Sequence, residues 1–219
     1  MRERFSGDTW RVLNDLDVES TNAAELRRAP AEIDRILLLL GALSGLSAES
    51  MHRGQGWRFL EIGRRLERAL MTLLMLRAVC PPSDIQAVPW EDLLALADVS
   101  ADYRRRNRAT APATLLADLF VGDETNPRSI VYQLRRLEQL LKGLSPQVVP
   151  PQRSAEEELL QAALAEMAPQ GTTEPIELDA DLDGRLARVQ KGLLAVSDQL
   201  TRSYFGRPDR LQQLVTIKR

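Results

Sequence analysis

Apolar residues recur every three or four positions along most of this chain, the spacing of a helix with one buried face. The clearest such stretch is 56–79, with apolar positions at Phe59, Ile62, Leu66, Ala69, Leu70, Leu73 and Leu76. Arginines and glutamates crowd its first turns, and Glu67 projects between Leu60 and Leu74 at the edge of the apolar arc. We therefore expect Glu67 to be partly buried, and such a carboxylate needs a partner.

The same period predicts helices at about 2–15, 30–51, 89–108, 110–120, 126–144, 153–168 and 179–204. Ser6 is the expected cap of the helix at 2–15, and Asn126 with Pro127 is the expected start of the helix at 126–144. The LLLL run at 37–40 predicts burial on more than one side of its helix. No segment alternates with period two over more than a few residues, so a sheet is not expected. The prediction is an all-α bundle of about seven or eight helices, forming a single domain over 1–219.

The heptad-like spacing of the last helix predicts packing along its whole length. Its apolar positions are Leu182, Leu186, Val189, Leu193, Val196 and Leu200.

Composition narrows the function classes. The 219 residues carry a net charge of −2, which gives no case for nucleic-acid or anionic-membrane binding, and we expect neither. The basic run at 103–108 is therefore interpreted as a solvated helix end or as a surface for an acidic partner. Cys80 is the single cysteine, which excludes an internal disulfide and a CxxC metal site, and His52 is the single histidine. No apolar run approaches the length of a membrane span and the first ten residues lack the apolar region of a signal peptide, so the expected location is the cytoplasm.

Four groups of residues carry a resemblance to a known family. They are Phe5-Ser6 with Trp10, Gly56-Trp57-Arg58-Phe59-Leu60 followed by Gly63-Arg64-Arg65-Leu66-Glu67-Arg68-Ala69, Asn126-Pro127-Arg128-Ser129 with Tyr132-Gln133-Leu134, and Tyr204-Phe205. In this order and spacing the chain resembles the alpha-E family, a domain of unknown function with a glutamate–arginine motif. Tyr103-Arg104 is a weaker match of the same kind. The family's earlier Tyr-Trp-x-Gly-Arg…Glu-Arg stretch has no counterpart here, so the resemblance covers the later two-thirds of the family domain.

The resemblance implies a bacterial all-α protein. Family members are often encoded beside, or fused to, a circularly permuted ATP-grasp protein and a transglutaminase-like protein, in a setting proposed for ATP-dependent amide or peptide bond formation. The resemblance supplies these two partners and no catalytic assignment. The chain has no GxxxxGK[ST] phosphate loop, so nucleotide binding is expected to belong to a partner, and no cofactor or metal is expected here.

The binding residues that we predict are Glu67, Arg68, Arg64, Arg128 and Tyr132. Arginine forks bind carboxylates, and the glutamate could hold them in position or bind an amine, so the expected ligand is a peptide, an amino acid or the partner. The plainer alternative pairs Glu67 with arginines of a neighbouring helix, namely Arg128, Arg135 or Arg136. Likewise, Asn126 to Ser129 could be a plain helix cap.

Three functions stay open at this point. The first is an accessory or substrate-recognition protein of an ATP-grasp ligase. The second is an enzyme in its own right that uses a buried Glu67 as general acid or base. The third is a structural oligomeric bundle. We expect no catalysis by His52 or Cys80, because no neighbouring motif would activate either. Trp10, Trp57 and Trp90 are expected to be core anchors.

Overall fold

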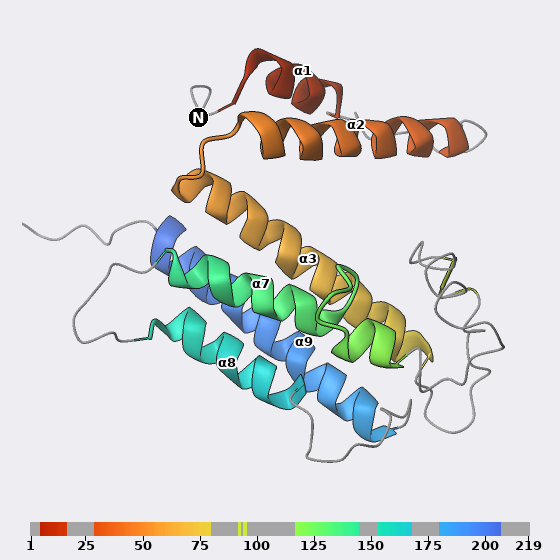
Figure 1. The fold of residues 1–219 in the computed structure, drawn as a ribbon, viewed down its shortest axis with the longest axis vertical. Coiled ribbons are helices and arrows are strands. Elements are labelled where there is room, and N and C mark those ends of the chain that lie inside the picture. Colours follow the sequence, from red (N-terminus) through yellow and green to blue (C-terminus); the bar gives the residue numbers. More distant parts are fainter. Residues whose placement is uncertain are drawn as a thin grey trace, which may run out of the picture. The chain divides into compact units, whose positions relative to one another are not determined.

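The computed structural model in Figure 1 describes residues 5–16, 29–79, 92, 94–95, 117–144, 153–167 and 180–206. Regular structure in these residues is helical and includes no strand, which confirms the all-α prediction. Contacts divide the chain into two units, Met1–Glu61 and Ile62–Arg219. The single domain expected over 1–219 stays a prediction. The helix predicted at 89–108 lies outside the described residues apart from 92, 94 and 95, and so do Cys80, Trp90 and the basic run.

The first unit contains α1 (Gly7–Asp15), α2 (Ala29–Ser50) and the start of α3 (Gln55–Val79). Ser6 caps α1 as predicted, because its Oγ accepts a hydrogen bond from the backbone N–H of Thr9 at 3.2 Å. The ring of Phe5 meets Trp10 edge to face with centroids 6.0 Å apart. This contact joins the residue before the cap to the fourth helical position, which is the hydrophobic-staple arrangement.

Helix α1 packs along α2 (Figure 1), and this contact decides which side of α2 is covered. The half-buried apolar residues of α2 are Ile36, Leu39, Leu43 and Leu46, whereas Ile33, Leu37, Leu38 and Leu40 are exposed. The burial predicted for the LLLL run on more than one side is therefore wrong. Helix α1 has 9 residues and α2 has 22, so at about 1.5 Å per residue α1 can cover only part of one side.

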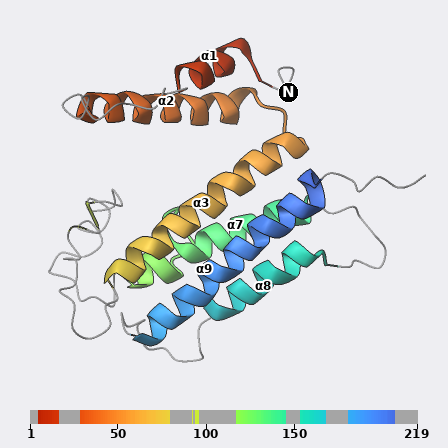
Figure 2. The same ribbon diagram turned by 180° about the vertical axis from the view of Figure 1, so that it is seen from behind.

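The second unit contains the rest of α3, the π-helical segment η3 (Asp118–Gly122), α7 (Ile130–Lys142), α8 (Ala155–Met167), α9 (Ala180–Leu200) and the π-helical segment η4 (Thr201–Phe205). Figures 1 and 2 show α7, α8 and α9 side by side, and contacts join α8 to both α7 and α9. Arg77 connects α3 to α9, since its guanidinium donates to Asp183 at 2.8 Å and to Gln190 at 2.7 Å.

The core of this unit follows the predicted periodicity. All six heptad positions of α9 are buried, and so are Ile62, Leu66, Ala69, Leu73 and Leu76 of α3. Helices α8 and α9 approach closely at Gly192, where an added Cβ would lie 3.5 Å from that of Ala163. In the described ranges, no helix is both long enough and apolar enough to cross a membrane.

Candidate functional site at the junction of α3 and α7

Glu67 and Arg68 lie on the exposed side of α3, and Arg64 one turn earlier is half-buried. The half-buried position predicted for Glu67 is therefore wrong. The buried stripe of α3 passes through Leu66 and Leu73, and Glu67 lies about 100° around the helix from Leu66. Its neighbours on the other side are exposed as well: Met71 is 55% exposed and Leu74 is 50% exposed.

The buried carboxylate of α3 is Glu61. The sequence does not single out Glu61, because six polar residues lie in the first three turns of this helix. A period of 3.6 residues ranks these positions by angle alone. It does not say which sector of the helix a neighbour covers.

Thr72 connects α3 to the segment before α7. Its side chain is 2% exposed, and its Oγ1 lies 3.0 Å from the carbonyl oxygen of Arg68 and 3.1 Å from that of Arg128. The first carbonyl belongs to the preceding turn of α3 and the second to the loop that leads into α7. The bridge thus holds the backbone of two predicted site residues, Arg68 and Arg128, close together. The sequence signal that could have identified this bridge is a threonine placed among the apolar residues of the helix face.

The start of α7 differs from the prediction. Ser129 is the N-cap, because its Oγ accepts from the backbone N–H of Tyr132 at 3.1 Å, and the helix begins at Ile130. Asn126 was expected in that role. Instead its Oδ1 accepts from the N–H of Arg128 at 2.9 Å and its Nδ2 donates to the carbonyl of Leu119 at 2.8 Å.

Asn126 is buried, and its bond to Leu119 connects the loop to η3, whereas its bond with Arg128 lies within the loop. Both Asn and Ser are good caps and good turn residues, so sequence alone does not decide between them.

Tyr132 and Gln133 follow the cap. Tyr132 is half-buried, whereas Gln133 is fully buried and its Nε2 donates to the carbonyl of Pro127. Gln133 therefore fixes the loop that contains Arg128 from inside the unit. A side-chain amide that satisfies a loop carbonyl keeps the backbone of that loop in one conformation.

Comparison with known proteins gives the family. Residues 1–205 match a family described as "a predicted alpha-helical domain with a conserved ER motif", whose name is Alpha-E. The chain belongs to the Alpha-E family. It is 32% identical over 230 residues to an uncharacterized protein of Mycobacterium bovis and to uncharacterized proteins of two Mycobacterium tuberculosis strains. Each match covers 98% of this chain but 26% of the relative, so the chain spans about a quarter of their length. No solved structure matches it.

The ion pairs around α7 bear on the alternative in which Glu67 of the Alpha-E motif pairs with arginines of the neighbouring helix. Arg135 pairs with Glu124 at 3.7 Å and with Glu138 at 3.5 Å, and Arg136 donates to Gln139 at 2.7 Å. These partners lie on α7 and in the turn before it. Arg135 and Arg136 are thus engaged on their own side of the junction.

This Alpha-E junction therefore offers arginines at 64, 68 and 128, the phenol of Tyr132 and the carboxylate of Glu67. Arginine donates in a fixed fork that matches carboxylate and phosphate oxygens, and a tyrosine hydroxyl can donate or accept. Among the described residues, no group of histidine, cysteine, aspartate and glutamate side chains could hold a metal ion.

Proposed function

We propose that this chain is an accessory protein that recognises a peptide or amino-acid substrate for an ATP-grasp amide or peptide ligase, and that it works in the cytoplasm. The observation that carries the proposal is the extent of the matches within the Alpha-E family. Almost the whole chain matches about a quarter of each mycobacterial relative, so in those proteins the domain is part of a longer polypeptide. A domain used in this way works next to others, and we assign the nucleotide-dependent chemistry to a partner. A transglutaminase-like protein is the second partner that we propose.

The exposed side of α3 is the surface that we assign to the ligase. Glu67, Met71 and Leu74 adjoin one another in helical projection, with Arg68 beside them. We call these four residues the α3 surface. Two exposed apolar side chains flanked by a carboxylate and a guanidinium have the composition of a protein interface, with an apolar centre and a charged rim.

The residues next to this surface are those that we assign to the substrate. Arg64, Arg128 and Tyr132 supply donors for a substrate carboxylate, with Glu67 and Arg68 at the boundary with the partner. The Thr72 bridge supports this arrangement, because it fixes the backbone of Arg128 relative to α3.

The enzyme hypothesis required a buried Glu67, and its exposed position does not provide one. The structural-oligomer hypothesis is tested by the same experiment as the proposal.

The test is co-expression with an ATP-grasp protein from the organism that encodes this chain, followed by size-exclusion chromatography with light scattering. We expect a stable complex with the wild-type chain. Leu74→Asp should weaken it about tenfold or more, because it places a charge at the apolar centre of the interface. Leu194→Asp is the matched control, since Leu194 on α9 is also 50% exposed, and it should bind like the wild type.

Separate peaks for the wild-type chain and the ligase would show that the proposal is wrong. A self-associated chain that Leu74→Asp converts to a monomer, with no ligase bound, would favour the structural oligomer. Glu67→Gln adds a further distinction. A recognition protein should keep ligase binding in this variant, whereas turnover by the isolated chain that is lost in it would favour an independent enzyme.

A further inference from the structure

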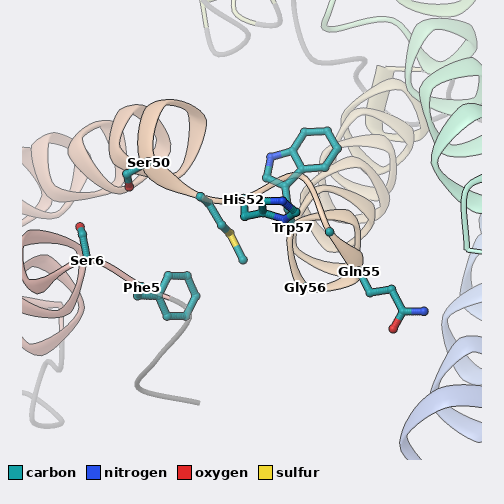
Figure 3. A pocket seen from close by; sticks show the side chains of 9 residues that line it. Phe5, Ser6, Ser50, His52, Gln55, Gly56 and Trp57 are labelled. Carbon is teal, nitrogen blue, oxygen red and sulfur yellow. The ribbon is translucent and has the colours of Figure 1, made fainter.

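A pocket within the first unit is separate from the junction of α3 and α7. It has a volume of about 630 Å³, in the range of small-molecule sites, and is formed where α1 begins, α2 ends and α3 begins. Figure 3 shows the ring of Phe5 on one side and Trp57 with His52 on the other. Met51 also lines it. From the sequence we expected no catalysis by His52 and a core-anchor role for Trp57, and this pocket brings the two together.

The apolar part of the lining is accessible and fixed in place. Phe5, Met51 and Trp57 are each half-buried, so they present surface to the pocket without being exposed outright. The guanidinium of Arg53 lies 4.7 Å from the centroid of the Trp57 ring and donates to the carbonyls of Ser47 and Ala48 at the end of α2. The Trp57 wall of the pocket is therefore attached through Arg53 to the end of α2, which lowers the entropic cost of binding.

The polar part of the lining that the structure describes consists of hydroxyl, imidazole and amide side chains. These side chains belong to Ser6, Ser50, His52 and Gln55, and the described part of the lining includes no aspartate, glutamate, lysine or arginine. Hydroxyl, imidazole and amide groups can donate and accept, which suits the C=O and N–H groups of a peptide. The first N–H groups of a helix such as α3 have no partner within that helix and add donors for a carbonyl oxygen.

We propose that this pocket binds a peptide segment, with an uncharged apolar side chain against Phe5, Met51 and Trp57 and the peptide backbone at its polar rim. The inference deepens the proposed function and rests on it, because it adds a separate site for an uncharged side chain, in the first unit, to the residues assigned to the substrate carboxylate. A charged side chain is rejected, since the apolar walls would remove its water without supplying a partner.

The test is titration of the wild-type chain with N-acetyl-phenylalanine amide, followed by ¹H–¹⁵N NMR of the tryptophan indole groups. Trp57→Phe identifies the Trp57 signal by its loss. We expect a saturable shift of that signal with the phenylalanine and leucine amides, and binding about tenfold weaker for the N-acetyl amides of glutamate and lysine. Met51→Ala should weaken the binding of the phenylalanine amide several-fold, whereas Met75→Ala, at a methionine of the second unit that is half-buried as Met51 is, should not.

Absence of a saturable shift, equal affinity for the charged amides, or an equal loss in Met51→Ala and Met75→Ala would each overturn the inference. The wild-type probe series decides the question even if Met51→Ala fails to fold. Because the chain is titrated alone, the result is independent of ligase binding. A complex without peptide binding would contradict only the pocket inference, and peptide binding without a complex would contradict only the ligase partnership.

Discussion

Replacing Thr72 with valine tests how α3 and the start of α7 are held together. The two side chains have nearly the same shape, so the change removes the hydroxyl from a site that is 2% exposed. The carbonyl of Arg68 keeps its helical N–H partner, whereas the carbonyl of Arg128 loses the hydroxyl 3.1 Å away. A buried acceptor without a partner costs about 1–3 kcal/mol, and we expect a loss of about 1–2 kcal/mol. For a chain of this length each kcal/mol lowers Tm by roughly 2–4 °C.

The assay is thermal and urea unfolding followed by circular dichroism. Thr201→Val is the matched control, because the exposed Thr201 makes the same hydroxyl-to-carbonyl bond to the preceding turn, to Ser197 at 2.9 Å. It lacks a bond to a second segment, so its effect should stay within about 0.5 kcal/mol. A Thr72→Val variant as stable as the wild type, or an equal loss of stability in both variants, would refute the bridging role of Thr72.

Three further predictions concern single residues. Ser129→Ala removes the cap of α7 and the donor to the carbonyl of Asp123, and unfolding should show a loss of about 1–2 kcal/mol; an unchanged midpoint would place the cap elsewhere. The hydrogen bond from Lys142 lowers the pKa of Glu138 below its ordinary 4.5, so this carboxylate stabilises the fold above that pH and the contribution is lost as the pH falls through the lowered value. Glu138→Gln should therefore lose less stability than the wild type on acidification, and a pH-independent difference would contradict this. Glu67→Ala should change unfolding by no more than about 0.5 kcal/mol, because Glu67 is exposed; a larger loss would favour the structural ion pair.

Much of the fold could be predicted because burial and periodicity agree wherever a helix has neighbours along its whole length. Helix α9 is the clearest case: Leu186, Val189 and Leu193 are all fully buried, as their heptad-like spacing predicts. Helix α2 is the opposite case, because its apolar residues outnumber the positions that α1 covers. Leu38 belongs to the run of four leucines that predicts burial, and it is 76% exposed. Periodicity identifies residues that share a face, and it carries no information on whether a second element covers that face.

The candidate site was predictable only as a set of motifs. The Glu-Arg pair and the Asn126–Ser129 segment were recognised separately, and nothing in their spacing indicates that Thr72 joins them. The cap was displaced by three residues because Asn126 and Ser129 can each serve as a cap or as a turn residue. A tertiary contact decides which residue is the cap. Because Asn126 bonds to Leu119 of η3, Ser129 is the N-cap of α7.

The exposed side of α3 bears on which role of the Glu-Arg pair is favoured. A pair that stabilises the fold gains most where burial removes water from both charges and a second helix supplies the counter-charge. Glu67 lies instead beside two exposed apolar side chains, Met71 and Leu74, on the side of α3 away from its buried stripe. Apolar residues gathered on an exposed helix face are costly to leave in water and are typical of surfaces that meet another molecule. A charged pair at the edge of such a surface gives orientation and specificity to that encounter and contributes little to folding. The placement of Glu67 and Arg68 thus supports recognition over a purely structural ion pair.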